Sequence, residues 1–353
     1  MNIIRCNRCI LPATYPDLRL NGEGVCHLCL MPPETRPAPE ELKKRLDEII
    51  AVHRGKGKYE ALVGLSGGKD SSYVAYYLRR EYGLKMLGIN FDNGYSSDYA
   101  VRNLTALVDA YGIDLVVLRP AQTFLKKLFA HFLRTHGEFC SVCNNMGYLL
   151  MASYSLSQQR ALGYTPLGVG GWSKKYEFQP GISVTSMQYF FKNLTPELFA
   201  ELIAQPFIEE KAVRAYMNVR DPRQVKINSN EHTALGDSVI SLIQLPDYVP
   251  WDLFRMPGIL RAEFGWEQPS GRHDSHFDCT LFPIKEYLKF KKYGLTQETI
   301  KNSILIREGL LTREKALERI KMEQTTEPES LHPFLRELGV DPQEVNEEGE
   351  WSR

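Results

Sequence analysis

The apolar positions between residues 59 and 172 follow a repeating pattern. Four apolar runs have the length of strands: 59–66, 85–92, 114–120 and 164–172. Between them lie four stretches with apolar residues at helical spacing: 71–83, 98–112, 122–136 and 142–160. Strands that alternate with helices of this length form a parallel sheet covered on both faces. We therefore predict an α/β fold with a doubly wound parallel sheet, in which ligands bind at the carboxyl ends of the strands.

The chain on either side of this pattern is organised differently. Residues 1–35 are rich in Cys, Pro and Gly, and residues 39–54 form an amphipathic helix. Further on come aromatic-rich helical pieces, Pro-punctuated loops and two helical stretches over 283–322, joined near Gly294 and Gly309. We expect the acidic tail to be partly extended. The predicted units are an N-terminal module (1–35), the sheet core (36–175), a specificity and helical C-terminal region (176–325) and the tail (326–353).

Composition limits the classes of function. A chain of 353 residues indicates one large domain with attachments, or two domains. Lys plus Arg and Asp plus Glu each number 43, so no global field recruits nucleic acid or a membrane. No secretory signal is visible, and no window approaches the roughly 20 apolar residues of a membrane span. We expect a cytoplasmic protein with reduced thiols, so its seven cysteines need a role other than disulfides.

Residues 66–71 are the sharpest local signal, because Ser-Gly-Gly-Lys-Asp-Ser lies directly after a strand and before a helix. Its glycines let the backbone approach an anion, and the helix N-terminus presents free N–H groups. Its hydroxyls and its lysine add donors and charge, and its aspartate can position a metal ion or cap the helix. The spacing matches neither the Walker loop nor the dinucleotide fingerprint. The predicted binding residues are Ser66, Gly67, Gly68, Lys69, Asp70, Ser71 and Ser72.

This loop resembles the PP-loop of the ATP pyrophosphatases, which cut ATP between the α and β phosphates. The resemblance implies ATP and Mg²⁺ as ligands and gives Ser66, Lys69 and Asp70 catalytic roles. It also implies that the second strand end and a later Gly loop hold the nucleotide, at Asn90, Phe91, Asp92, Asn93, Gly170, Gly171, Trp172 and Ser173. Lys174 or Lys175 would reach the phosphates. In such chemistry a substrate oxygen becomes an adenylate, and Mg²⁺ and the loop lysine neutralise the departing pyrophosphate.

Four cysteines form a CxxC…CxxC pair within a short segment that has little core of its own: Cys6, Cys9, Cys26 and Cys29. Four thiolates at this spacing can close a tetrahedron around Zn²⁺. We therefore predict a structural zinc ribbon over 1–35. A zinc ion with four sulfur ligands has no open position, so no catalysis is expected there.

The other three cysteines are Cys140, Cys143 and Cys279. Three ligands with one open site suit a [4Fe–4S] cluster that binds an exogenous ligand. The arrangement resembles that of the PP-loop thiolation enzymes that modify tRNA. Two alternatives stay open: a three-cysteine zinc site completed by His276 or Asp278, and a chain in which Cys279 is an isolated core thiol.

Both ends of the chain, residues 6–29 and 287–320, resemble the N-acetyl sugar amidotransferases of surface-polysaccharide pathways. That resemblance implies a transferase that activates the acetamido carbonyl of a small molecule, such as a nucleotide-linked N-acetyl sugar, and replaces its oxygen by nitrogen. A separate glutaminase partner would supply the ammonia. The alternative is a sulfurtransferase that thiolates a small molecule or a tRNA base with the help of a sulfur donor protein.

The sequence argues against two further hypotheses about function. A nucleotide-binding regulator without catalysis conflicts with the intact loop at 66–71. A tRNA substrate is disfavoured by the balanced charge, although Arg5, Arg8 and Arg19 could form a local contact within the Cys-rich module.

Overall fold

The computed structural model describes residues 3–15, 17–31, 37–162, 164, 166–171, 187–217, 232–235, 238–269, 277–321 and 326–346. Its strands are β1 (Ala61–Gly64), β2 (Met86–Phe91), β3 (Asp114–Leu118), β4 (Leu167–Gly170), β5 (His232–Leu235) and β6 (Ser238–Gln244). The helices of the sheet region are α2 (Pro39–His53), α3 (Lys69–Tyr82), α4 (Asp98–Tyr111), α5 (Gln122–His136) and α6 (Cys140–Leu162). The remaining helices are α1 (His27–Leu30), α7 (Met187–Lys192), α8 (Pro196–Ile203), α9 (Glu210–Met217), α10 (Met256–Phe264), α11 (Phe282–Tyr293), α12 (Gln297–Arg307), α13 (Arg313–Lys321), α14 (Leu331–Leu338) and α15 (Pro342–Asn346).

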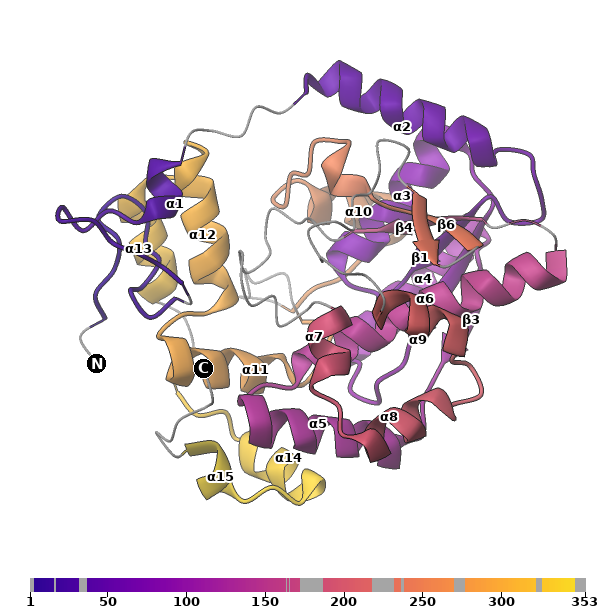
Figure 1. Ribbon diagram of the computed structural model, residues 1–353. Helices are drawn as coiled ribbons and strands as arrows, with labels where there is room; N and C mark the ends of the chain where they lie inside the picture. The colour runs from indigo at the N-terminus through magenta and orange to yellow at the C-terminus, as the bar shows by residue number, and fades with distance from the viewer. Residues whose placement is uncertain are drawn as a thin grey trace.

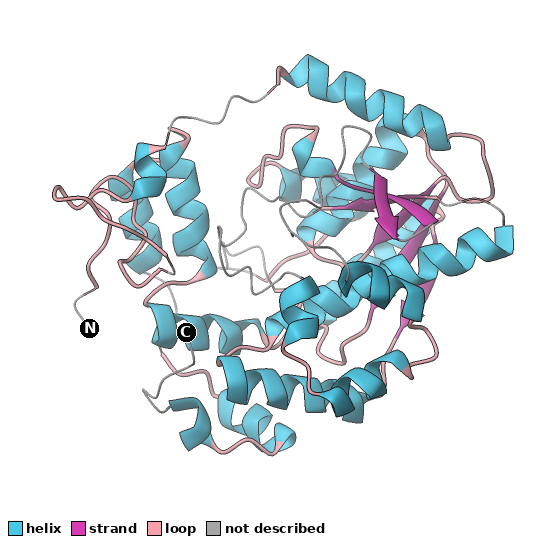
Figure 2. Ribbon diagram, viewed as in Figure 1, coloured by secondary structure: helices cyan, strands magenta, loops and turns pink. Residues whose placement is uncertain are grey.

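The strands form a single sheet in the order β3-β2-β1-β4-β6-β5. Figure 2 shows the strands of this sheet surrounded by helices. Strands β1, β2, β3, β4 and β6 pair in parallel, and β5 runs antiparallel to β6. The central strands β1, β2 and β4 are buried along nearly their whole length, as a sheet covered on both faces requires. The predicted doubly wound α/β fold is confirmed. Strands β5 and β6 extend it beyond the four strands expected from the sequence.

The acidic tail is not extended over residues 331–346, where the structure has α14 and α15. Helix α14 buries apolar side chains three and four residues apart, including Leu331, Phe334 and Leu338. The ring of Phe334 lies 5.1 Å from that of Phe139 and 5.8 Å from that of Tyr95. The expectation of a partly extended tail is therefore wrong here, because an apolar helical face ties the segment to the core.

The Cys-rich module packs against α12 rather than standing alone (Figure 1). Its buried Leu11 and Tyr15 share one apolar cluster with Ile300 and Ile304 of α12. Arg313 of α13 donates hydrogen bonds to the carbonyl oxygens of Cys9, at 3.3 Å, and Cys6, at 3.4 Å. The ribbon and the C-terminal helices thus form one packed unit.

Three helices, rather than the expected two, occupy residues 282–321. Gly294 and Gly309 each adopt a positive φ, of 64° and 71°, and the helices on either side end or begin at these turns. In the described part of the chain, no helix is long and apolar enough to cross a membrane.

Candidate functional site

A cavity of about 430 Å³ lies at the carboxyl ends of β1, β2 and β4. This is where a doubly wound sheet binds its ligands, and the volume falls within the range of small-molecule sites. The predicted residues that line it are Ser66, Gly68, Lys69, Asp70, Ser71, Asn90, Phe91, Asn93, Cys140, Cys143, Gly170, Gly171 and Cys279. Gly67, Ser72 and Asp92 lie outside the lining, and Trp172, Ser173, Lys174 and Lys175 fall outside the described residues.

The backbone of Gly67 fixes the loop at the start of α3. Its φ is 78°, and a Cβ at this position would overlap the carbonyl oxygen of Ala100. The Gly67 carbonyl accepts hydrogen bonds from Trp266 Nε1 at 3.2 Å and Asn103 Nδ2 at 3.4 Å. These contacts fix Gly67 on the side away from the cavity, and the residues that follow it line the cavity.

Ser66 links the loop to a residue far along the chain. Its Oγ donates a hydrogen bond to Asp278 Oδ2 at 3.1 Å and accepts one from the backbone N–H of Gly68 at 3.2 Å. The Oγ of Ser71 lies 3.2 Å from that of Ser66. Burial raises the pKa of Asp278. The sequence suggested Asp278 as a general base or a metal ligand, and the structure places its carboxyl group against the turn at residues 66–71.

Lys69 and Asp70 form a close ion pair, with Nζ 2.7 Å from Oδ1. The Lys69 side chain is 1% exposed and that of Asp70 is 31% exposed. Burial lowers the pKa of Lys69, and the neighbouring Asp70 opposes this shift. Trp251 Nε1 donates to the same Asp70 oxygen at 3.1 Å, a contact that sequence reasoning missed. Asp70 thus keeps a carboxylate edge toward the cavity, which suits a Mg²⁺ ion.

Among the four predicted nucleotide-binding residues at the end of β2, Asn90 and Asp92 form hydrogen bonds or ion pairs with other parts of the protein. Asn90 Nδ2 donates to the Leu65 carbonyl at 2.6 Å, so this amide braces β1. The Asp92 carboxylate caps the N–H of Gly94 at 2.8 Å and pairs with Arg119 at 3.2 Å. These contacts give Asn90 and Asp92 structural partners, although Asn90 also lines the cavity, together with Phe91 at the end of β2 and Asn93 just after it.

The Gly loop after β4 approaches the PP-loop helix closely. A Cβ at Gly171 would lie 3.0 Å from the Asp70 carbonyl oxygen, and one at Gly170 would overlap the amide of Gln244. Side chains at both positions would crowd their neighbours, which explains two glycines at this strand end.

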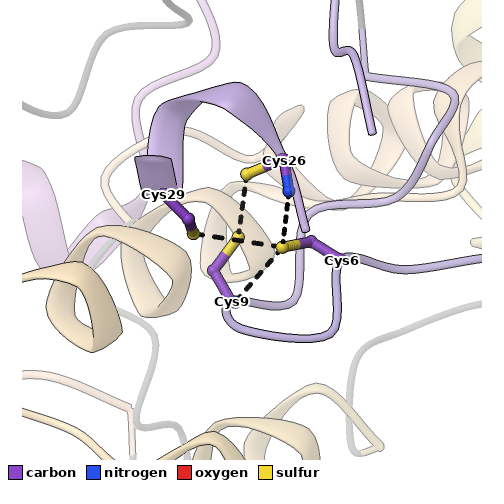
Figure 3. A group of neighbouring side chains, drawn as sticks. All are labelled: Cys6, Cys9, Cys26 and Cys29. Carbon is purple, nitrogen blue, oxygen red and sulfur yellow. Dashed lines mark hydrogen bonds between the residues drawn. The ribbon is translucent and has the colours of Figure 1, made fainter. Parts of the chain in front are cut away.

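The four cysteines of the N-terminal module point toward one another (Figure 3). The sulfur atoms of Cys6 and Cys29 are 3.9 Å apart and those of Cys9 and Cys26 are 3.7 Å apart. Zinc–sulfur bonds of about 2.3 Å in a tetrahedron place sulfurs about 3.8 Å apart. The backbone N–H of Cys26 donates to Cys6 Sγ at 3.2 Å, which favours a thiolate. The quartet fits a closed zinc site.

The three remaining cysteines meet at the cavity. Residues 277–281 run beside the segment that follows β2: Ser96 and Cys279 form a bridge, and Ser97 N donates to the Asp278 carbonyl at 3.0 Å. Asn93 Nδ2 lies 3.4 Å from Cys143 Sγ and 3.9 Å from Cys279 Sγ. Cys279 is therefore not an isolated core thiol.

The spacing of these three sulfurs differs from that of the ribbon. Within the described residues, only the ribbon quartet has its ligand atoms all within 4.8 Å of one another. One zinc ion requires that closeness, whereas a cluster of four irons holds its thiolates farther apart. Asp278, one suggested fourth zinc ligand, is engaged with Ser66, and His276 lies outside the described residues. Burial raises the pKa of Cys140 to about 12 and also raises that of Cys143. These three sulfurs are therefore not arranged as a single zinc ion requires.

Comparison with known proteins places these features in context. Residues 272–348 match the model of the C-terminal domain of LPS biosynthesis WbpG-like proteins. An uncharacterized protein of Methanocaldococcus jannaschii is 23% identical over 343 residues, covering 96% of this chain and 99% of its own length. The tRNA-specific 2-thiouridylase of Polaromonas sp. is 33% identical over 87 residues. That match covers 22% of this chain and 21% of the thiouridylase.

Among solved structures, the U34-tRNA thiolase of Methanococcus maripaludis with its [4Fe–4S] cluster superposes with a TM-score of 0.37 and 15% identity. The superposition covers 94% of this chain and 91% of the thiolase.

Proposed function

We propose that the chain belongs to the PP-loop ATP pyrophosphatase superfamily and is an AMP-forming enzyme that activates a carbonyl oxygen of its acceptor. The observation that carries the proposal is the turn at residues 66–71, which lines a cavity at the strand ends with a buried lysine and an accessible carboxylate. The N-terminus of α3 supplies free N–H groups and a positive dipole end for phosphate. The carboxylate of Asp70 would hold Mg²⁺, which supplies charge neutralisation when bound.

The residues divide the first step between them. The carbonyl oxygen of the acceptor attacks the α phosphorus, the bond to the β phosphate breaks, and pyrophosphate leaves. Lys69 and the loop N–H groups neutralise that leaving group. Ser66, fixed by Asp278 at 3.1 Å, orients the turn. The glycines at 170–171, where a Cβ would meet Gln244 or Asp70, let the strand end approach the turn closely.

For the second step we propose nitrogen transfer to an N-acetyl sugar linked to a nucleotide. Ammonia would attack the activated carbon, and AMP would leave with the former carbonyl oxygen, so that the acetamido group becomes an acetamidino group. The match of residues 272–348 to a domain of LPS biosynthesis proteins supports this choice of acceptor. A separate glutaminase would supply the ammonia.

Sulfur transfer is the second candidate, because Cys140, Cys143 and Cys279 line the same cavity as the PP-loop. A [4Fe–4S] cluster on these residues would supply a binding position for exogenous sulfide. The acceptor would then be a small molecule or a tRNA base, and a donor protein would deliver the sulfur.

One experiment separates the two candidates. Protein purified without oxygen is assayed for zinc, iron and acid-labile sulfide, and is then incubated with MgATP, a panel of nucleotide-linked N-acetyl sugars and either ammonium or sulfide. Nitrogen transfer predicts pyrophosphate release with ammonium and a product of slightly lower mass than the acceptor. Bound iron and sulfide, with a heavier product formed only with sulfide, would replace nitrogen by sulfur. No pyrophosphate under any condition contradicts the proposed activity.

A further inference from the structure

Helix α12 is buried on two sides, each against a different part of the molecule. Ile300 and Ile304, which are 3% and 6% exposed, pack into the core of the Cys-rich module. Gln297 and Lys301, one helical turn apart, line the cavity. Figure 1 shows α12 lying next to α1 of the ribbon. Helix α12 therefore lies between the Cys-rich module and the cavity, and one cationic side chain of the helix lines the cavity.

The cation that α12 presents is Lys301, whose residue is only 8% exposed. Its Nζ lies 3.3 Å from Glu298 Oε1 on the same helix, and that carboxylate is 36% exposed. Lys301 and Lys69 line the same cavity from different elements. Burial lowers the pKa of Lys69, and the nearby charge of Lys301 lowers it further. Two cations that repel each other across a cavity are stabilised when an anion lies between them.

The geometry points to Lys301 as a second cation for the β and γ phosphates of ATP, opposite the PP-loop, where it would also hold pyrophosphate as it leaves. This inference rests on the proposed ATP site. The N-terminus of α3 and Lys69 define where the phosphates lie, and Lys301 is the cationic residue of α12 that lines the same cavity. The same ligand chemistry could come from the diphosphate of a nucleotide-linked acceptor, and the test below distinguishes the two sources.

The ribbon gives α12 a fixed position, which a long side chain needs if it is to meet a phosphate reproducibly. Besides the apolar contact between the module and α12, Arg313 of α13 donates hydrogen bonds to the carbonyl oxygens of Cys6 and Cys9. Arg5 donates to the carbonyl oxygen of Gly294, just before α12, at 3.3 Å. These contacts fix the position of α12 against the Cys-rich module.

Calorimetric titration of the full-length, zinc-loaded protein tests this with three probes in the presence of Mg²⁺: AMP, inorganic pyrophosphate and α,β-methylene-ATP. Lys301→Gln is expected to weaken pyrophosphate and α,β-methylene-ATP about tenfold, the effect of losing one charged hydrogen bond, and to leave AMP unchanged. Lys301→Arg keeps the charge and should bind pyrophosphate more tightly than Lys301→Gln does. Lys291→Gln, on the exposed side of α11, is the matched control and should bind all three probes as the wild type does.

Three outcomes contradict the inference. Unchanged pyrophosphate affinity in Lys301→Gln would mean that Lys301 faces another ligand, such as the acceptor diphosphate. An equal loss for AMP, or a lowered melting temperature without a specific loss for pyrophosphate, would make Lys301 a structural residue. A wild-type protein that binds neither AMP nor pyrophosphate would contradict the proposed ATP site itself, and the role of Lys301 would fall with it.

Discussion

Gly67→Ala tests whether the close contact between Gly67 and the backbone of Ala100 fixes the geometry of the loop at residues 66–71. Gly67 has φ 78°, and a Cβ there would overlap the backbone oxygen of Ala100 in α4. Gly83, at the other end of α3, offers a matched control. It has φ 64°, but nothing lies within 4 Å of its added Cβ. The two substitutions therefore share the conformational strain and differ in the overlap.

The expected loss of unfolding free energy is the sum of the conformational strain and, for Gly67→Ala, the overlap with Ala100. Placing an alanine in the left-handed region costs about 1–2 kcal/mol, and this is the full effect predicted for Gly83→Ala. Overpacking against a neighbour that cannot rotate away adds about 1–3 kcal/mol, so Gly67→Ala should lose about 2–5 kcal/mol of unfolding free energy. Relief of the overlap requires the loop to move away from α4, so we also expect ATP binding to be lost.

Urea unfolding followed by tryptophan fluorescence measures the first quantity, since Trp266 donates directly to the Gly67 carbonyl. Titration with ATP measures the second. Equal destabilisation of the Gly67 and Gly83 variants would refute the argument from the Ala100 contact. So would a Gly67→Ala protein that binds ATP as tightly as the wild type.

Three further predictions address other parts of the molecule. Cys9→Ser removes one sulfur ligand and should lower both the bound zinc and the melting temperature, whereas unchanged zinc content would contradict the ribbon. Trp251→Phe removes the N–H donor to Asp70 but keeps an aromatic ring, so MgATP should bind several-fold more weakly while the melting temperature changes little; an unaltered Kd would exclude a role for this contact. Burial alone would raise the pKa of Glu286, but the charges of Lys289 and Lys285 lower it on balance below its ordinary value. A carboxyl group with a lowered folded-state pKa stabilises above its unfolded pKa and loses that contribution as the pH falls. The stability advantage of the wild type over Glu286→Gln should therefore shrink between about pH 7 and pH 3, and a gap that stays constant would contradict this assignment.

The parts of the fold that the sequence predicted are those with strong local patterns. Strands β1 to β4 are short apolar runs between amphipathic helices, and the PP-loop lies at the β1–α3 junction as expected. The apolar face of α14 was also present in the sequence, but the acidic composition of the segment obscured it. Strand β6 was missed because residues 238–244 follow a stretch without clear periodicity, and their strand conformation depends on pairing with β4.

The parts of the site that could not be predicted depend on contacts between distant segments. Asp278 lies 212 residues from Ser66, and Trp251 lies 181 residues from Asp70. No local pattern relates such positions, since only the packing of the chain brings them to the loop. The same holds for Lys301, which belongs to a helix whose pattern indicates burial but not the cavity it faces. The position of Cys279 was predicted in part, because a third cysteine in addition to the CxxC pair suggested a common site.

The proposed function depends on the cleavage of ATP between its α and β phosphates in the cavity at residues 66–71. Phosphorus NMR of a reaction containing MgATP, a nucleotide-linked N-acetyl sugar and ammonium reports the products directly. We expect AMP and pyrophosphate with the wild type and neither product with a folded Lys69→Ala variant. Formation of ADP and phosphate, or equal turnover by Lys69→Ala, would contradict the proposed function.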